Sequence, residues 1–571
     1  MNVSEYIIHY LKEKGVTHYF GYQGTMISYF VDALYRIPGV HNHSCYNEQG
    51  AAFAACGMAQ ASGQCAVAYS TSGPGAANLL SGVANAYMDS EPVLFITGQV
   101  NTYEYTNIPE LRQQSFQELN VVDMAKPVTK YCVQITCVED VRYHLEKAWH
   151  LATTGRPGPV LLDIPMNIQR SEIHPETLRS YEPEKMVEDS CEDCLHTIEK
   201  HLQKAARPIL LVGGGVHPAS QKPLLAFARS HHIPIVTSLL GKSLLPHGDE
   251  LNFGYLGTYG MRIANLLAGI KADLLVCIGI SMCTRQTGVK VEQFAPHAQL
   301  IRIDVDPDAL RRKVRSDDLC FAVDADQVIA GLGKLNIPDF SSWLSICLQC
   351  RTYLEEFDRT APGREPNRIV EKIAALTTEG SAVASDVGQH MMWVGQSLAV
   401  KKGQRVLFSG GHGAMGYALP AAIGAYYHTG KPSFMIAGDG SFQMNIQELQ
   451  WVVREHLPIK MFVLNNHVLG MIRFQQNDYF EGRYGGAARG FDYAPCDFVK
   501  VAQSYGIRSF QVTNPDELDR LQDEMRSPDP VLIEILLPDD TSAVPKTFLG
   551  KPIYNQRPYI PEEKLEWLIN I

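Results

Sequence analysis

The chain has 571 residues, of which 45% are hydrophobic and 19% charged, a composition typical of globular proteins with large cores. Its 50 basic and 61 acidic residues give a formal net charge of −11, which disfavours a nucleic-acid partner because such a partner needs a basic face. No apolar run approaches the ~20 residues of a membrane span, and the first residues lack the basic segment of a secretory signal. We therefore expect a cytoplasmic enzyme of several domains, with small-molecule substrates and no membrane partner.

Short apolar segments alternate with helical segments along the whole chain, and no short repeat is visible. The first third predicts strands at 19–22, 65–71 and 92–98, with helices at about 48–62 and 75–89. The middle third predicts strands at 208–216, 233–240, 272–280 and 299–306. The last third predicts strands at 381–388, 405–410, 433–440, 459–466 and 530–537.

Apolar strands separated by helices are typical of parallel sheets covered on both faces. The sequence therefore predicts an α/β protein of three doubly wound parallel-sheet domains. Two polar segments, 171–190 and 354–367, are expected to be linkers. The predicted domains are 1–172, 190–350 and 367–545, followed by a tail at 546–571.

The sequence contains thirteen cysteines, and four of them form two CxxC pairs, Cys191/Cys194 and Cys347/Cys350. A zinc site would need the fold to bring the two pairs together. They lie far apart in the sequence, so reduced, buried thiols are the expected alternative.

A glycine-rich turn after one predicted strand indicates a site that binds a diphosphate through a bridging metal ion. Glycines in Gly438-Asp439-Gly440-Ser441 let backbone N–H groups approach phosphate oxygens, and Ser441 adds a hydroxyl. Asp439 offers an anionic oxygen to a hard cation such as Mg²⁺, and Asn466, at the end of the next strand, offers a neutral one. Since ligands of such sheets bind beyond the carboxyl ends of strands, these groups are expected to meet there.

The GDG…NN pattern, with 24 residues between its halves, resembles the signature of the thiamin-diphosphate-dependent enzymes. The resemblance implies pyrimidine-binding (PYR), central and diphosphate-binding (PP) domains, in that order. It also implies that Mg²⁺ is held by Asp439, Asn466 and the backbone carbonyl of Val468. The residues that it assigns to the cofactor are Val387, Gly388, Gln389, His390, Gly413, Met415, Gly438, Gly440, Ser441, Asn466, Leu469, Gly470 and Met471.

Glu48 lies at the start of a predicted alanine-rich helix. Taken alone, an acidic residue at this position is explained by its favourable interaction with the helix macrodipole. Because the GDG…NN pattern is also present, the resemblance implies that Glu48 is the family's activating glutamate. Its carboxyl would hydrogen-bond the aminopyrimidine N1′ and promote the imino form, which then removes the C2 proton. Met415 would bend the cofactor into its V shape, although a methionine there is also typical of a core.

Nearly the whole chain resembles the acetolactate synthase catalytic subunits, in stretches such as FGYQGT, TSGPGAANLL, FITGQV and GHGAMGYALPAAIGA. The resemblance implies decarboxylation of pyruvate and addition of the hydroxyethyl-enamine to a second carbonyl. It places Gly24, Phe116 and Gln117 near the reacting centre, and it implies a homodimer or homotetramer with the cofactor at a subunit interface. Arg285 would bind a carboxylate of the acceptor; a salt-bridged arginine is the alternative.

Several positions depart from that family. Gln475 replaces a tryptophan of the acceptor pocket, Met166 replaces a lysine, and the C-terminal end differs. A more polar pocket leaves open a keto-sugar nucleotide or an aldehyde as acceptor. FAD is possible, because Gly213–Gly215 is present, but Ser281 and Cys283 replace polar partners of the flavin. A FAD-dependent pyruvate oxidase and a middle domain that only packs therefore remain as alternatives.

Overall fold

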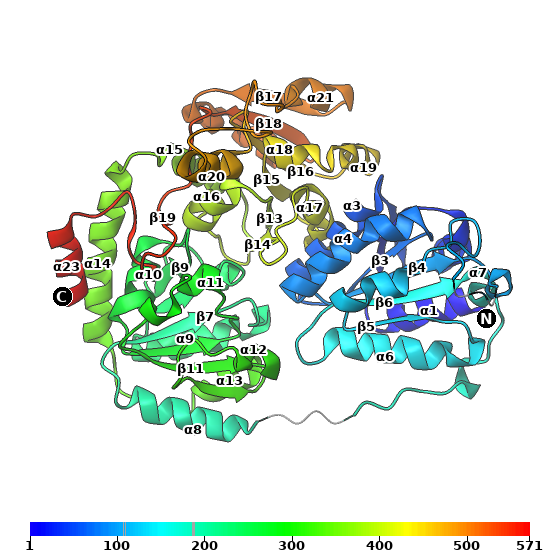
Figure 1. The fold of residues 1–571 in the computed structure, drawn as a ribbon, viewed down its shortest axis with the longest axis horizontal. Helices are drawn as coiled ribbons and strands as arrows, with labels where there is room; N and C mark the ends of the chain where they lie inside the picture. The colour runs from blue at the N-terminus through cyan, green and yellow to red at the C-terminus, as the bar shows by residue number, and fades with distance from the viewer. Residues whose placement is uncertain (107, 109, 185–188) are drawn as a thin grey trace.

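The structure is a computed structural model that describes residues 1–106, 108, 110–184 and 189–571. In these residues the chain forms three six-stranded sheets of parallel strands, flanked by helices (Figure 1). This arrangement confirms the predicted fold class. Central strands such as β3 and β7 are buried at every residue, because helices cover both faces of each sheet.

The first and last sheets have the same topology. Their strand orders, β2-β1-β3-β4-β6-β5 and β14-β13-β15-β16-β18-β17, correspond strand for strand, whereas the middle sheet runs β9-β8-β7-β10-β11-β12. The middle order is that of dinucleotide-binding folds. The strands are β1 His18–Gly21, β2 His41–Ser44, β3 Ala66–Ser70, β4 Val93–Gln99, β5 Tyr131–Gln134, β6 Val160–Pro165, β7 Pro208–Val212, β8 Ile235–Thr237, β9 Asn252–Tyr255, β10 Leu274–Ile278, β11 Gln299–Asp304, β12 Leu319–Ala322, β13 Ala382–Ser385, β14 Arg405–Phe408, β15 Ser433–Gly438, β16 Ile459–Asn465, β17 Arg508–Val512 and β18 Val531–Leu536.

The sequence interpretation missed β6 and five strands at sheet edges, namely β2, β5, β9, β12 and β17. Edge strands have one unpaired side, and these five are at most partly buried. Partial burial does not require the continuous apolar run that marks a central strand, so a polar segment such as HNHS in β2 gave no signal.

The longer helices connect these strands. They are α1 Val3–Glu13, α2 Ser28–Arg36, α3 Glu48–Ser62, α4 Pro74–Asp89, α6 Val141–Thr153, α8 Cys191–Leu202, α9 Gln221–His231, α13 Ala325–Leu332, α14 Ser341–Thr360, α15 Glu365–Leu376, α16 Gln389–Ser397, α17 Ala418–Thr429, α20 Gly470–Tyr479, α21 Phe498–Ser504 and α23 Glu562–Asn570.

The first and last units pack through α3 and α17, two alanine-rich helices in one continuous core. The backbones approach closely at two glycines. A Cβ on Gly57 would collide with the backbone of Ala421, and a Cβ on Gly424 would collide with the carbonyl oxygen of Ala54. This contact fixes the N-terminal unit against the helix that follows the loop of Gly413 and Met415.

We expect Gly424→Ala to lower the free energy of unfolding by about 1–3 kcal/mol, the usual cost of an overpacked core. The measurement is thermal unfolding followed by circular dichroism. Gly333→Ala is the matched control, since a Cβ there would meet no atom within 4 Å. Equal midpoints for the two variants would contradict the close contact of α3 with α17.

The second predicted linker, 354–367, is wrong over most of its length. α14 continues to Thr360 and α15 starts at Glu365, so both predicted domain limits, 350 and 367, fall within helices. The apolar side chains of α14 form a stripe at helical spacing and pack on the middle core, which holds the helix together beyond residue 350. Residues 185–188 of the first predicted linker lie outside the described residues.

The C-terminal tail returns to the middle unit. A short antiparallel hairpin pairs β19 (Lys546–Thr547) with β20 (Gln556–Arg557), and α23 then lies beside α14 (Figure 1). The buried Lys271 ammonium donates to three main-chain oxygens near the end of the chain, those of Leu568, Ile569 and Ile571. The tail is therefore anchored at its far end.

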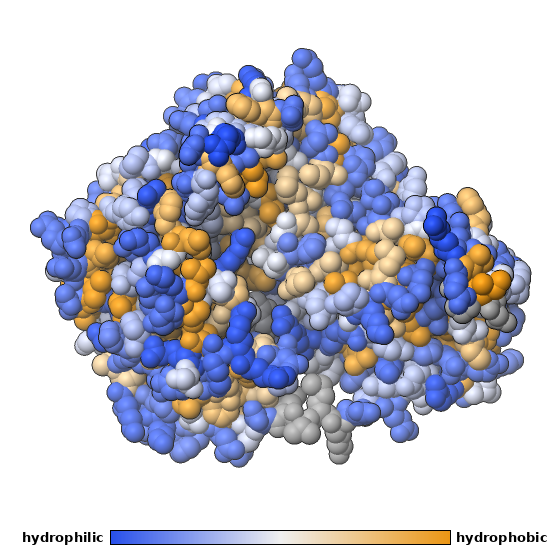
Figure 2. Space-filling model, viewed as in Figure 1, coloured by the Kyte–Doolittle hydropathy of each residue, from blue (hydrophilic) through white to orange (hydrophobic). Residues whose placement is uncertain are grey.

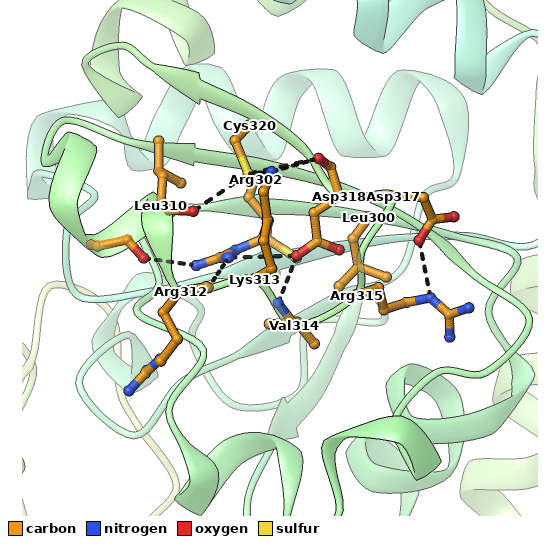
Figure 3. A network of polar contacts seen from close by, with 12 residues as sticks. Leu300, Arg302, Leu310, Arg312, Lys313, Val314, Arg315, Asp317, Asp318 and Cys320 are labelled. Carbon is orange, nitrogen blue, oxygen red and sulfur yellow. Dashed lines mark hydrogen bonds and ion pairs between the residues drawn. The ribbon is translucent and has the colours of Figure 1, made fainter.

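A buried ion pair stiffens the edge of the middle sheet (Figure 3). The guanidinium of Arg302 lies 3.5 Å from the carboxylate of Asp318, and both side chains are almost fully buried. The same guanidinium donates to the carbonyl of Arg312 at 2.6 Å, and Asp318 accepts from the Val314 N–H at 2.9 Å. These bonds position Arg312, which in turn donates to the carbonyl of Ser281.

The molecular surface is mostly hydrophilic on the face shown in Figure 2, with a hollow near the centre of that face. Within the described residues, we find no helix with both the length and the apolar character that a bilayer crossing requires.

Candidate active site

A cavity of about 660 Å³ lies between the middle and last units. Its floor is formed by the carboxyl ends of β13, β15 and β16, and its walls by α11 (Thr284–Thr287), α20 and the C-terminal hairpin. All the predicted site residues of the last unit line it, together with Arg285. They are Val387, Gly388, Gln389, His390, Gly413, Met415, Gly438, Asp439, Gly440, Ser441, Asn466, Val468, Leu469, Gly470, Met471 and Gln475.

Asp439 stands at the end of β15, where it starts the short helix α18 (Asp439–Gln443) rather than a simple turn. Its side chain is buried, with 3% exposure for the residue. One carboxylate oxygen accepts the Gly440 N–H at 2.9 Å, and the other has no hydrogen-bond partner among the described residues. Burial raises the pKa of this carboxyl to about 6, as expected for an anion that lacks a counter-charge.

Asn466 lies at the neighbouring strand end, because β15 and β16 pair in parallel with Gly438 opposite Leu464. Its amide nitrogen donates to Thr541 Oγ1 at 2.9 Å and to Gln389 Oε1 at 3.3 Å. The amide oxygen accepts the Val468 N–H at 3.4 Å and keeps a second lone pair for another partner. The arrangement offers a hard cation two side-chain oxygens at adjacent strand ends.

These donors fit Mg²⁺, which prefers oxygen ligands and shares them with phosphates. In the part of the chain that the structure describes, no three His, Cys, Asp or Glu side chains gather into a metal-binding cluster. A cation at this site would therefore use one carboxylate, one amide and a backbone carbonyl, and it would complete its shell with ligand phosphates or water.

Two further buried groups shape the floor of the cavity. The Asp386 carboxylate accepts the N–H groups of Val387, Gly416 and Ala418 at 2.8–3.0 Å, which fixes the loop of Met415 against β13. Burial lowers the pKa of His390 to about 3, so its ring is neutral near pH 7. Sequence analysis assigned the four residues that follow Asp386 to the cofactor but did not reveal that Asp386 organises this loop.

The predicted residues of the first unit do not line this cavity. Glu48 is the first residue of α3, after the N-cap Asn47, and is 7% exposed; its carboxylate accepts from Asn78 Nδ2 at 3.1 Å. Phe116 is 75% exposed, Gln117 has a φ of 60°, and Gly24 precedes a short helical turn. Within one chain, the structure therefore does not bring these four residues to Asp439.

Sequence reasoning missed the contribution of the C-terminal hairpin. Residues 546–551 line the cavity, and so do Thr258, Tyr259 and Phe474. The segment KTFLGK matches no recognised motif, so the only available signal was that this end departs from the family pattern. Its position depends on contacts with the middle unit that are distant in sequence.

The residues of the middle unit do not fit a flavin at the turn 279–285. Ser281 and Cys283 offer neither a long cation nor a carboxylate there. The Ser281 carbonyl accepts from Arg312 at 3.1 Å, and the Cys283 N–H donates to Gln286 at 2.9 Å, so both backbone groups already have partners. FAD remains a prediction of the sequence alone.

Comparisons with known proteins cover all three units. The chain matches the N-terminal TPP binding domain of thiamine pyrophosphate enzymes over residues 1–124, their central domain over 195–332 and their C-terminal TPP binding domain over 386–535. It is 36% identical to the probable acetolactate synthase large subunit of Methanocaldococcus jannaschii, over 97% of this chain and 95% of that protein. It is 35% identical to the acetolactate synthase isozyme 2 large subunit of Escherichia coli K12, over 94% and 95%. A large subunit from Lactococcus lactis is 32% identical, over 95% and 93%.

Proposed function

The chain belongs to the acetolactate synthase large-subunit family of thiamine pyrophosphate enzymes, and on that basis we propose that it decarboxylates pyruvate and joins the remaining two-carbon unit to a second 2-keto acid. The observation that carries this proposal is the pair of oxygen donors at adjacent strand ends, Asp439 and Asn466, in a cavity large enough for a cofactor and a small substrate.

Thiamin diphosphate, when bound, supplies a carbon nucleophile and an electron sink. Asp439, Asn466 and the Val468 carbonyl would hold Mg²⁺, with the glycines at 388, 438, 440 and 470 allowing close approach of the diphosphate. Met415 and Leu469 give the cavity apolar walls beside these polar groups. No step of the proposed reaction uses a flavin.

Glu48 would exchange a proton with the cofactor's aminopyrimidine N1′, a role that needs a buried carboxyl. The cavity of its own chain does not contain Glu48, so we infer that a second copy supplies it in a homodimer. Large apolar side chains are exposed on the first unit, including Tyr22, Tyr46 and Phe116. Burial of such side chains would favour association.

Arg285 lines the same cavity, and its guanidinium can bind a carboxylate through two parallel hydrogen bonds. This property favours 2-keto acids over uncharged carbonyl compounds. Gln475, also in the lining, adds an amide that can orient a carbonyl or a hydroxyl group.

The test uses purified protein with thiamin diphosphate, Mg²⁺ and pyruvate. We expect one CO₂ released and one molecule of acetolactate formed for every two pyruvates consumed, measured by mass spectrometry and CO₂ trapping. Omission of thiamin diphosphate, or chelation of Mg²⁺, should stop both the release of CO₂ and the formation of acetolactate. A protein that binds the cofactor but releases no CO₂ from pyruvate would refute the proposal.

A further inference from the structure

The C-terminal hairpin places a lysine in the cavity wall. Lys546 begins β19, and its side chain is only 14% exposed. Its ammonium nitrogen lies 3.8 Å from the centre of the Phe474 ring and 5.1 Å from that of Phe548. Two aromatic faces thus hold the cation in place, as expected for a partly desolvated ammonium.

Backbone hydrogen bonds connect the segment that carries this lysine to the segment that carries Arg285. The Thr547 N–H donates to the Thr258 carbonyl at 2.8 Å, and the Thr258 N–H donates to the Arg285 carbonyl at 2.8 Å. Three segments from distant parts of the sequence therefore lie side by side, and residues of each line the cavity. Lys546 and Arg285 project from neighbouring segments of one wall.

The hairpin is fixed, not a loose surface arm. The buried Arg262 guanidinium donates to the carbonyls of Gln556 and Pro558, at 3.0 and 2.7 Å. Asn265 Nδ2 and Thr547 Oγ1 both donate to the carbonyl of Ile553, at 3.0 and 2.7 Å. Such anchoring gives Lys546 a defined position before any ligand binds, which lowers the entropy cost of using it.

The charges of the cavity favour an anionic ligand. Among the described lining residues, Arg285, Lys546 and Lys551 are cationic, and Asp439 is the single carboxylate, which faces the proposed metal. Asp478 lies 3.6 Å from the Lys546 nitrogen, beyond hydrogen-bonding distance. The ammonium therefore keeps donors available for a ligand. Burial lowers the pKa of Lys546 and the nearby Asp478 opposes that shift.

We propose that Lys546 binds the carboxylate of the acceptor together with Arg285, so that the C-terminal hairpin selects a charged acceptor over an uncharged carbonyl compound. The proposal rests on the proposed function. Lys546 is then a specificity residue for the second half of the reaction. Lys546 does not take part in binding the cofactor, which is the role of the groups around Asp439.

The experiment compares two acceptors that differ by a carboxylate. Pyruvate is supplied as donor with an equimolar mixture of 2-ketobutyrate and propanal, and mass spectrometry gives the ratio of the two mixed products. We expect Lys546→Met to lower the ratio of charged to uncharged product at least tenfold, and Lys546→Arg to restore most of it. Lys290→Met is the matched control, since Lys290 lies near the hairpin but outside the cavity lining.

Asp478→Asn separates binding from a structural role. If Lys546 binds the acceptor, removing its carboxylate neighbour should keep or raise the product ratio. If Lys546 only fastens the hairpin to α20 through that ion pair, Asp478→Asn should behave like Lys546→Met, and the proposal is overturned. Calorimetric titration with thiamin diphosphate and Mg²⁺ should give unchanged affinity for all four variants.

The remaining outcomes are also decisive. An unchanged ratio in a Lys546→Met protein that still turns over pyruvate overturns the assignment of Lys546 but leaves the proposed function intact. Equal loss of both products shows that Lys546 serves the cofactor or the fold, and again overturns it. A wild-type protein that releases no CO₂ from pyruvate refutes the proposed function and this inference with it.

Discussion

Replacement of Glu48 by glutamine should lower turnover of pyruvate by about 10²–10⁴-fold, the usual range for the loss of a general acid–base group. The amide keeps the shape of the carboxyl and can still accept from Asn78, so the start of α3 should remain folded. Turnover is measured as CO₂ release at saturating thiamin diphosphate and Mg²⁺. Glu13→Gln is the control, an exposed acid at the end of α1 in the same unit and distant in sequence from every predicted site residue of that unit.

Mixing two inactive variants tests whether Glu48 acts on the partner's cavity. In a heterodimer of Glu48→Gln with Asp439→Ala, one site carries both substitutions and the other carries neither. Random reassociation of equal amounts should therefore restore about a quarter of the wild-type activity, because half the dimers are mixed and each has one intact site of two. If each chain built its site alone, every site in the mixture would carry one substitution and no activity would return.

The first unit also contacts a loop that lines the cavity of its own chain. Asn85 Oδ1, on α4, accepts from Ser409 Oγ at 2.6 Å, and Ser409 accepts the Ala414 N–H at 2.8 Å. Asp89, at the end of α4, accepts the Gly411 N–H at 2.6 Å. These contacts support the loop of Gly413 and Met415. In the proposed dimer, the first unit would thus position one cavity through α4 and complete the other through Glu48.

The sequence predicted those parts of the molecule whose chemistry or pattern is local. The central strands carry continuous apolar runs, and Asp439 and Asn466 follow two strands that pair directly, so both the sheets and the floor of the cavity could be inferred. The edge strand β2 has no such run, and the polar surface of α14 resembles a linker in the sequence. The inward-facing stripe of α14 becomes evident only against the core it covers.

Other parts of the site depend on contacts between distant segments. Lys546 reaches the cavity because Arg262 and Asn265 anchor the hairpin nearly 300 residues later in the chain. No spacing rule connects these positions. Glu48 shows the opposite case: its role was inferred from a family motif, yet its location in one chain leaves it outside the cavity. In the proposed homodimer, the second subunit would complete that role.

Asp439→Asn should have opposite effects on cofactor binding and on the stability of the cofactor-free protein. The wild-type carboxylate is buried with one oxygen unpartnered, which costs free energy in the absence of a cation. The uncharged, isosteric amide removes that buried charge. Burial raises the pKa of the carboxyl to about 6, so its ionised form is destabilised near pH 7. We therefore expect the cofactor-free variant to be more stable at pH 7 by about 1–3 kcal/mol, since one pKa unit corresponds to about 1.4 kcal/mol.

The same change removes the anionic ligand of the proposed Mg²⁺. Because loss of groups that only support a metal ligand costs about 10–100-fold in affinity, loss of the ligand itself should weaken thiamin diphosphate binding by more than about 100-fold. Calorimetric titration at fixed Mg²⁺ measures the affinity, and thermal unfolding of cofactor-free protein measures the stability. Asp523→Asn, an exposed aspartate of α22 (Gln522–Arg526), should change neither. A stabilised variant that still binds the cofactor tightly would show that Asp439 is not the metal ligand, whereas a destabilised one would show that its buried oxygen is satisfied in the cofactor-free protein.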